Sequence, residues 1–292
     1  MFSTSQLDAY LQRIGLARPR RPTADALIRI HRAHIDTVPY ENLAIQLGRP
    51  IRLDADALFE KIVVERRGGF CYEQNHMLAL ALEAVGFNVR RVLGGVARAT
   101  AGDDNWFNHL PLLVRAGRGE YLADVGLGVG FRDPLPLREG SHRVGVFNFG
   151  LWRIDGAPGG ADRWRCSIDP RVQDLSVDFE TAARAIGDFE SKCRELSTAP
   201  DSPFVKTLTV QRPGARATAV LRARTFTVYD PALPEGRSVR LIEEAEEFAA
   251  LLGGDFGLAL SAADLRTLWE LACGQHERHV AEEDKAASAS GV

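Results

Sequence analysis

The sequence predicts an α+β protein with a helical first part, a run of short strands, and a last part that mixes strands and helices. Three observations support this order. Apolar residues recur at helical spacing up to Gly86, and short apolar or alternating segments separated by glycines follow up to Ile168. Both kinds of segment occur after Pro200. A chain of 292 residues can bury a large core and form two or three domains.

Composition narrows the function classes. Hydrophobic residues make up 45% and charged residues 26% of the chain, and the net charge of -3 is too near neutral to favour nucleic acid or a membrane as partner. The four cysteines are scattered without a Cys-x-x-Cys pair, so we expect reduced thiols and no disulfide framework. Residues 1–16 lack the apolar run of a signal peptide. These features predict a soluble, cytoplasmic protein.

Capping and stop signals define the first elements. We expect a helix over 5–17, a second from a cap at Thr23 to Pro39, a third from a cap at Asp54, and a fourth from Cys71 to Glu83. Gly86 stops the fourth helix.

After Gly86 the spacing of apolar residues changes to that typical of strands. The predicted strands cover 87–96, 109–114, 121–124, 144–154 and 163–168, which suggests a small antiparallel barrel or sandwich. A helix is expected over 179–197, and strands over 204–211, 217–221 and 225–229. Helices over about 241–252 and 261–273 precede a tail from residue 281 that is expected to be disordered.

Cys71 is the candidate nucleophile. A free cysteine is mostly thiol at neutral pH, and a helix N-terminus or a neighbouring imidazole lowers its pKa. Gly68 and Gly69 precede Cys71, and an apolar helical run follows it. The backbone amides of Cys71 and Tyr72 would then point outward and could hold an oxyanion. A buried structural cysteine is the alternative interpretation.

His109 is the candidate base among seven histidines, because it stands where an apolar strand begins. His76 lies five residues after Cys71, about 140° around the helix, and should point away. His31 and His34 fit the surface or the edge of the core. Asp124 follows the apolar run 121–123, and a turn separates it from the strand of His109, so these strands should pair and Asp124 could orient the imidazole.

These residues stand in a pattern that resembles the arylamine N-acetyltransferase family. The resemblance covers roughly residues 30–210 in the family's order. It is carried by Val38-Pro39-Tyr40-Glu41-Asn42-Leu43, by Arg66-Arg67-Gly68-Gly69-Phe70-Cys71-Tyr72-Glu73-Gln74-Asn75, by His109, by Asp124-Val125-Gly126, and by Pro200-Asp201-Ser202-Pro203-Phe204-Val205.

The resemblance implies a three-part fold with a Cys–His–Asp core like that of cysteine proteases. Residues 1–86 would form a helical bundle carrying the nucleophile, 87–198 an antiparallel β-barrel carrying histidine and aspartate, and 199–280 an α/β lid, followed by the tail 281–292. The implied triad is Cys71, His109 and Asp124. The implied reaction moves an acetyl group from acetyl-CoA, as acyl-donor co-substrate, to an arylamine, arylhydroxylamine or hydrazine by a ping-pong route, without a metal.

The resemblance also suggests binding residues. Gly126, Gly128 and Gly130 would expose backbone to the coenzyme phosphates, although a tight turn alone would explain these glycines. The acceptor would contact Phe70, Leu127 and Phe204. Family members often have Phe where Leu127 stands and Gly where Val129 stands, which leaves the acceptor preference open. His76 replaces a residue that is usually small or apolar. The lid helices over 241–273 could support a homodimer or pack on the barrel.

Other functions remain open at this point. A transglutaminase-like or protease-like hydrolase uses a similar triad, and an amide synthase of the same family would use the same residues on another acceptor. A structural metal module is also conceivable, since Cys273, His276 and His279 stand at intervals of three. On one helix the first and last would diverge by about 120°, and no fourth ligand is evident.

Overall fold

Helices build the first part of the chain. The computed structural model describes residues 2–154 and 160–290, with side chains described up to residue 285. As predicted, Thr23 and Asp54 cap helices, and Gly86 ends one with φ of 103°. The first elements are α1 (Thr4–Arg13), α2 (Ala24–Thr37), α3 (Leu43–Gln46), α4 (Ala55–Phe59) with a π-helical turn over Glu60–Val64, and α5 (Cys71–Val85).

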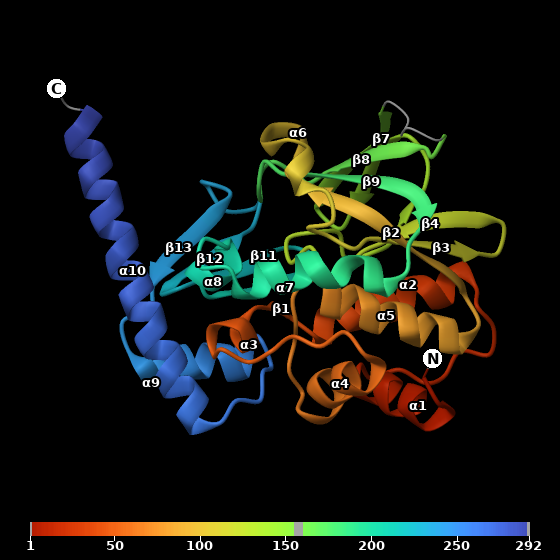
Figure 1. Cartoon of the computed structure of the whole chain (residues 1–292), viewed down its shortest axis with the longest axis horizontal. Coiled ribbons are helices and arrows are strands. Elements are labelled where there is room, and N and C mark those ends of the chain that lie inside the picture. The colour runs from red at the N-terminus through yellow and green to blue at the C-terminus, as the bar shows by residue number, and fades with distance from the viewer. Residues whose placement is uncertain (1, 155–159, 291–292) are drawn as a thin grey trace.

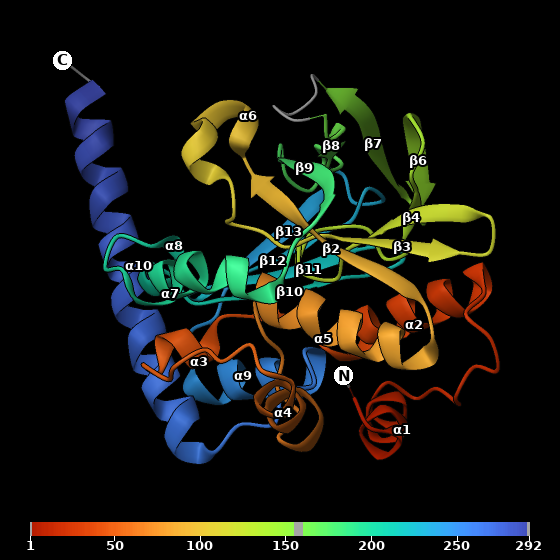
Figure 2. The same cartoon turned by 45° about the vertical axis from the view of Figure 1, so that its right-hand side comes forward.

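Helix α5 is the central element of this part. Every residue from Cys71 to Leu82 is buried, so the helix has no solvent-facing side over that length. Figure 2 shows α5 between the other helices and the sheet of the middle part. The sequence reflects this position, because Met77–Leu82 is continuously apolar and the polar residues Glu73–His76 cluster in the first turns. Those buried polar residues need partners, and they find them around the site described below.

The middle part is one antiparallel sheet in the strand order β5-β4-β3-β2-β9-β8-β7-β6, which curls into a nearly closed barrel (Figure 1). Its core contains Phe131, Phe149, Trp164 and Phe179. The strands are β2 (Asn88–Val96), β3 (Leu112–Ala116), β4 (Gly119–Ala123), β5 (Leu135–Pro136), β6 (Gly140–Val144), β7 (Phe147–Ile154), β8 (Arg163–Ser167) and β9 (Ser176–Ala183). A short helix, α6 (Arg98–Ala101), and a 3₁₀ turn (Asp103–Asn105) follow β2.

The predicted helix over 179–197 is wrong in its first third. Residues up to Ala183 belong to β9, and the helix α7 begins only at Glu190, after a 3₁₀ turn over Ile186–Phe189. Tertiary pairing overrides the local pattern. Asp178 is fully buried between Arg98 and Arg165, and Glu180 is buried beside Arg163. Buried carboxylates of this kind hide the strand alternation from the sequence.

A second sheet forms the last part, in the order β1-β10-β11-β12-β13. One face, with Val210, Leu221 and Phe226, packs on the last helices. Strand β1 comes from the first part of the chain and also bridges Gly69, and β13 was not predicted. The elements are β1 (Tyr40–Glu41), α8 (Pro203–Lys206), β10 (Thr209–Pro213), β11 (Thr218–Arg222), β12 (Thr225–Tyr229), β13 (Arg237–Leu241), and α9 (Ala245–Ala250) with a π-helical turn over Leu251–Asp255.

The segment from residue 281, expected to be disordered, is helical as far as Ser290. It continues α10 (Ala262–Ser290), while residues 291–292 lie outside the described part. Alanine, glutamate and lysine have high helix propensity, and adding residues to an existing helix avoids the cost of nucleation. Figure 1 shows this end of α10 projecting beyond the rest of the chain. The division into three domains at residues 86 and 198 stays a prediction.

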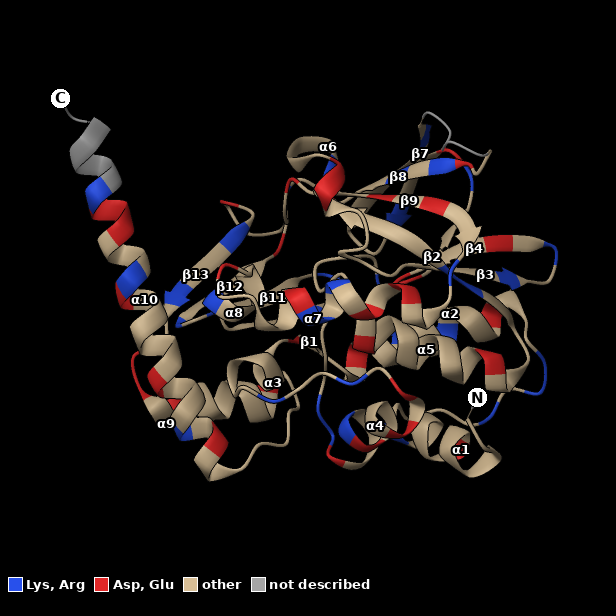
Figure 3. Ribbon diagram, viewed as in Figure 1, with Lys and Arg blue, Asp and Glu red and all other residues tan. Residues whose placement is uncertain are grey.

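Charged residues of both signs are spread over helices and strands (Figure 3), in keeping with the net charge of -3. Within the described residues, no helix combines the length and the apolar character needed to span a membrane.

Gln275 should be a strong stability determinant of the last part. It is buried on α10, accepts a hydrogen bond from the Leu208 N–H at 2.7 Å, and donates one to Gln46 Oε1 at 2.7 Å. Gln275→Ala leaves the buried Leu208 amide without this acceptor, so we expect a loss of about 1–3 kcal/mol in the free energy of unfolding. Urea denaturation measures it. Glu277→Ala, at an exposed position of the same helix, is the matched control and should change stability by less than about 0.5 kcal/mol.

Candidate active site

The loop before α5 is held tightly against β1. Glu41 N–H donates to the Gly69 carbonyl at 3.0 Å. A Cβ on Gly68 would lie 2.1 Å from the Pro39 carbonyl oxygen, and one on Gly69 would lie 2.8 Å from Glu73 Cβ. The two glycines are therefore required because other parts of the chain approach their backbone closely.

Two buried ion pairs fix the same loop. Lys61 Nζ lies 2.7 Å from Glu73 Oε1, and Arg67 lies 3.1 Å from Glu41 Oε1. Glu73 Oε2 also accepts the Phe70 N–H at 3.2 Å, which caps the first turn of α5. Burial raises the pKa of Glu73, and the Lys61 ammonium opposes this shift. Losing either cation would leave a buried carboxylate unpaired, so the start of α5 is strongly constrained.

Cys71 is the first residue of α5 and is 3% exposed. Its Sγ lies 3.7 Å from the carbonyl oxygen of Asn108, the residue before His109. Burial raises the pKa of the Cys71 thiol well above its usual value, and the charge of Asp124 raises it further, while the Tyr72 N–H lowers it. The helix start does act as predicted through the Tyr72 amide, but burial outweighs it in the free protein.

His109 and Asp124 meet, as the pairing of their strands indicated. Strands β3 and β4 pair in the register Leu112 with Ala123, so His109 just before β3 and Asp124 just after β4 come to the same end. His109 Nε2 lies 2.7 Å from Asp124 Oδ2, and the two residues are 1% and 2% exposed. This geometry leaves Nδ1 as the ring nitrogen free to act on a substrate or on a thiol.

Asp124 has further partners that sequence analysis missed. Its Oδ1 accepts from Asn75 Nδ2 at 2.8 Å and from the Gly126 N–H at 3.0 Å. Asn75 Oδ1 accepts in turn from the Val125 N–H at 2.9 Å. Asn75 stands four residues after Cys71 and so lies on the same side of α5. That spacing was a signal in the sequence that could have identified it.

The histidines of α2 were predicted wrongly. His31 and His34 are both completely buried, not at the surface or the core edge. His31 Nε2 accepts the backbone N–H of Asp124 at 3.1 Å, and His34 bonds the Tyr10 hydroxyl at 2.7 Å and Gln74 at 2.5 Å. Each buried ring is tolerated because both of its nitrogens have partners.

His76 faces away from the site, as its helical spacing indicated. Its Nδ1 accepts from Arg91 Nε at 2.9 Å, and Arg91 also pairs with Glu83 at 2.6 Å. Burial, followed by the Arg91 charge, lowers the pKa of His76 to about 3, so this ring is neutral at physiological pH. His76 therefore connects α5 to β2.

The glycines of the 126–130 loop are buried against the protein. A Cβ on Gly126 would lie 2.8 Å from Cys71 Cα, and one on Gly128, where φ is 60°, would lie 2.0 Å from Gln211 Oε1. A Cβ on Gly130 would lie 2.9 Å from Leu127 Cβ. These contacts support the tight-turn interpretation, and a coenzyme contact at Gly126, Gly128 and Gly130 stays a prediction.

The three residues expected at the acceptor pocket separate into two groups. Phe70 and Phe204 meet edge to face, with ring centroids 5.5 Å apart. Leu127 instead packs in the barrel core with Val129 and Phe131. The structure thus brings two of the three together, and an acceptor contact at Phe70, Leu127 and Phe204 stays a prediction.

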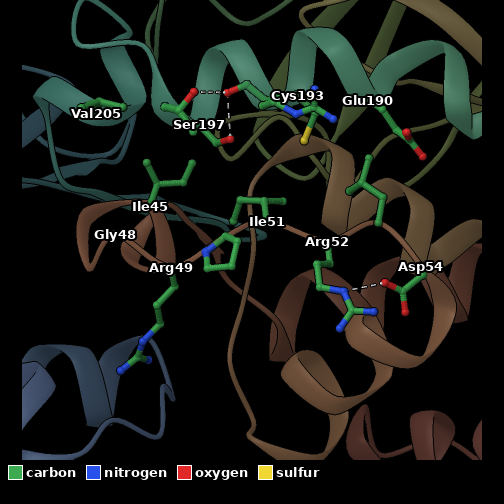
Figure 4. A pocket seen from close by; sticks show the side chains of 14 residues that line it. Ile45, Gly48, Arg49, Ile51, Arg52, Asp54, Glu190, Cys193, Ser197 and Val205 are labelled. Atoms are coloured by element: carbon green, nitrogen blue, oxygen red, sulfur yellow. Dashed lines mark hydrogen bonds and ion pairs between the residues drawn. The ribbon is translucent and has the colours of Figure 1, made fainter.

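The described part of the chain contains two large cavities. One of about 760 Å³ separates the 48–54 loop from α7, and the Cys193 thiol points from α7 toward that loop (Figure 4). Burial raises the pKa of Cys193 to about 12, so this thiol is protonated. The lining of this cavity contains none of Cys71, His109 and Asp124.

The other cavity, of about 800 Å³, lies on the face of the second sheet that carries Val220 and Thr227, opposite its core face. Lys206, Arg222 and Arg278 contribute positive charge to its lining. Like the first cavity, this one has none of Cys71, His109 and Asp124 in its lining.

The segment suspected of binding a metal is occupied by other contacts. His279 on α10 pairs with Glu283 at 3.3 Å. In the part of the chain that the structure describes, no group of three or more His, Cys, Asp and Glu side chains is arranged to hold a metal ion.

Comparison with known proteins identifies the family. A family model described as N-acetyltransferase matches residues 23–265. The arylamine N-acetyltransferase of Mycolicibacterium smegmatis is 36% identical over 228 residues, 76% of this chain and 82% of that protein. The arylamine N-acetyltransferase structure from Mycobacterium abscessus has a TM-score of 0.81 at 30% identity, over 92% of this chain and 95% of that one.

A second solved structure is that of Mycobacterium marinum arylamine N-acetyltransferase in complex with CoA. It has a TM-score of 0.77 at 28% identity, over 91% of this chain and 98% of that one. The fold and the family expected from the sequence are both confirmed. The chain belongs to the arylamine N-acetyltransferase family, and it is an acetyltransferase.

Proposed function

We propose that this acetyltransferase moves an acetyl group from acetyl-CoA to the nitrogen of an arylamine, arylhydroxylamine or hydrazine through an acetyl-Cys71 intermediate. The observation that carries the proposal is the buried His109–Asp124 pair, 2.7 Å apart, next to a cysteine that begins a buried helix. The family membership and the CoA complex of the Mycobacterium marinum relative support acetyl-CoA as the donor.

The first half-reaction loads Cys71. His109 Nδ1 takes the thiol proton as the sulfur attacks the acetyl carbonyl carbon, and the carbon–sulfur bond to the coenzyme then breaks. The coenzyme leaves as a thiol after receiving the proton from His109. Because burial raises the pKa of Cys71, a thiolate forms only if a neighbouring positive charge offsets the penalty. The imidazolium supplies this charge, and the Asp124 carboxylate stabilises it.

The second half-reaction discharges Cys71. The acceptor nitrogen attacks the thioester carbonyl, His109 accepts the proton of the nitrogen, and the Cys71 thiolate leaves and is reprotonated. In both steps, backbone amides at the start of α5, including that of Tyr72, would hold the oxyanion. The same residues therefore serve two similar transition states, which is the basis of a ping-pong route.

The cavity of about 800 Å³ is the proposed donor site. Lys206, Arg222 and Arg278 in its lining suit the phosphates of a coenzyme, because cationic side chains recognise phosphate by charge-assisted hydrogen bonds. Phe70 and Phe204, which pack edge to face, are the proposed aromatic contacts of the acceptor ring, as the family resemblance implies.

Intact-protein mass spectrometry after mixing with acetyl-CoA tests the nucleophile. We expect one acetyl adduct on the native chain, none on Cys71→Ala, and rapid loss of the adduct when an aromatic amine or hydrazine is added. Cys193→Ala is the matched control, because it removes another buried thiol close to Cys71, and it should load as the native chain does.

Other results would redirect the assignment. An adduct that no amine discharges would point to another acceptor, as in an amide synthase. An adduct that persists in Cys71→Ala would contradict Cys71 as nucleophile. No adduct with any acyl-CoA would contradict the donor and favour a hydrolase or transglutaminase reaction.

Phe204→Ala separates acceptor binding from donor loading. Removing the ring that meets Phe70 should weaken the use of arylamines by roughly 2- to 10-fold in kcat/KM, the effect expected for losing one aromatic pair, while the rate of acetyl loading changes little. Stopped-flow measurement of each half-reaction gives both values. Asp201→Ala, at an exposed position of the same segment, is the control and should leave both values near native. Equal losses in both half-reactions of Phe204→Ala would contradict its assignment to the acceptor site.

A further inference from the structure

Helix α2 binds the segment 131–133 through a set of charged hydrogen bonds. Arg32 forms two hydrogen bonds with Asp133, at 2.8 and 2.7 Å. Arg132 bonds both carboxylate oxygens of Asp36, through its Nε at 2.6 Å and through its second guanidinium nitrogen. Paired bidentate contacts of this kind fix orientation as well as distance. His31 directly precedes Arg32 on α2, so these contacts also fix the position of His31.

The His31 ring lies between this segment and the candidate active site. It stacks on Phe131, with centroids 5.9 Å apart and planes at 10°. Its Nδ1 lies 2.9 Å from the Arg132 carbonyl oxygen, and its Nε2 lies 3.1 Å from the Asp124 backbone nitrogen. A carbonyl can only accept a hydrogen bond and a backbone N–H can only donate one. His31 must therefore carry its proton on Nδ1 and present a lone pair on Nε2.

The surroundings keep the ring in this state. His31 is completely buried, and burial lowers its pKa, which the Arg132 carbonyl and the charges of Asp124 and Asp133 only partly oppose. A second proton on Nε2 would point at the N–H of Asp124, and the hydrogen bond would be lost. Neutral His31 is thus a fixed acceptor, and the Arg132 carbonyl at the opposite ring nitrogen sets the direction of its ring.

We propose that His31 is a positioning residue that orients Asp124 and, through Asp124, the imidazole of His109. The inference rests on the proposed acyl-transfer function. Hydrogen bonds from Asn75 and Gly126 hold Oδ1 of Asp124, and His31 holds its backbone amide. With these points fixed, the remaining oxygen Oδ2 is directed at His109 Nε2.

Loss of the His31 acceptor should therefore change the positions of Asp124 and His109, and with them the reaction rate. The buried Asp124 N–H would be left without this partner, which favours a shift of the backbone toward another acceptor. A shift of about 1 Å at a catalytic group costs on the order of 10²-fold in rate. The imidazolium would also be less stabilised, so the Cys71 thiolate beside it would form at a higher pH.

His31→Phe is the test, because it keeps an aromatic ring against Phe131 and removes both hydrogen bonds. We expect kcat, normalised to the amount of Cys71 that loads an acetyl group, to fall by about 10- to 100-fold, with the KM for acetyl-CoA changed by less than about 2-fold. The pH midpoint for alkylation of Cys71 by iodoacetamide should move upward. His31→Gln should recover most of the rate, since an amide offers one donor and one acceptor at similar separation.

His34→Phe is the matched control. His34 is an equally buried histidine on the same helix, and it bonds Tyr10 and Gln74 instead of Asp124. It should lower the melting temperature while leaving the normalised kcat and the alkylation midpoint near native values. A native rate and midpoint in folded His31→Phe would overturn the proposal, as would equal shifts in His34→Phe.

The alkylation experiment needs no acyl donor, so it remains informative if the proposed acyl transfer is wrong. Native protein labelled with ¹⁵N-histidine provides a measurement that does not depend on the folding of a variant. Long-range ¹H–¹⁵N spectra should show His31 as the neutral Nδ1–H tautomer throughout pH 6–8. A ring protonated on Nε2, or one that titrates within this range, would contradict the proposal.

Discussion

The structure depends on the satisfaction of one buried carboxylate. Asp124 directly follows β4, and its contacts come from His31 on α2, Asn75 on α5 and His109 just before β3. An ionised carboxylate out of water is tolerated only when its oxygens have donors, so these elements cannot move independently without a large penalty. The same requirement that holds the parts together also directs one carboxylate oxygen at His109.

Whereas hydrogen bonds stabilise the charge of Asp124, the surroundings of Cys71 disfavour a charge on its sulfur. Cys71 is held by a loop with two buried ion pairs and by a glycine, Gly126, that allows the backbone to approach it. This rigidity comes with burial, which disfavours the thiolate. Reactivity therefore depends on charge separation within the site and not on the exposure of the sulfur. Because the thiolate is the reactive form, a thiol that stays protonated in the free protein also reacts more slowly with electrophiles other than the substrate.

Much of the architecture was predictable because its signals are local. The caps at Thr23 and Asp54, the end of α5 at Gly86, and the strand β12 over Thr225–Tyr229 follow from residue types at fixed offsets. The pairing of the strands that carry His109 and Asp124 followed from the turn between them. Family resemblance added the division into a helical part, a barrel and a final sheet with helices.

The missed features depend on contacts between distant residues. Strand β9 carries carboxylates that look solvent-exposed until the arginines of other elements are placed beside them. His31 was expected at the surface or the edge of the core, because nothing near it in sequence shows that the Asp124 amide needs an acceptor. The raised pKa of Cys71 follows from burial by the whole fold, whereas the sequence shows only the helix start. Local rules therefore identified the groups but not their electrostatic environment.

Strand β1 has a consequence for synthesis on the ribosome. Tyr40 and Glu41 pair with Gln211 and Val210, and Tyr40 also bridges Gly69 in the loop that leads to Cys71. The nucleophile loop is thus supported by a strand whose other neighbour is made only after most of the chain has been translated. Contacts with such long separation in sequence form late and slowly. The helical part can become compact early in translation, but its cysteine reaches its final setting only when the second sheet emerges, so a truncated nascent chain does not carry a finished reactive site.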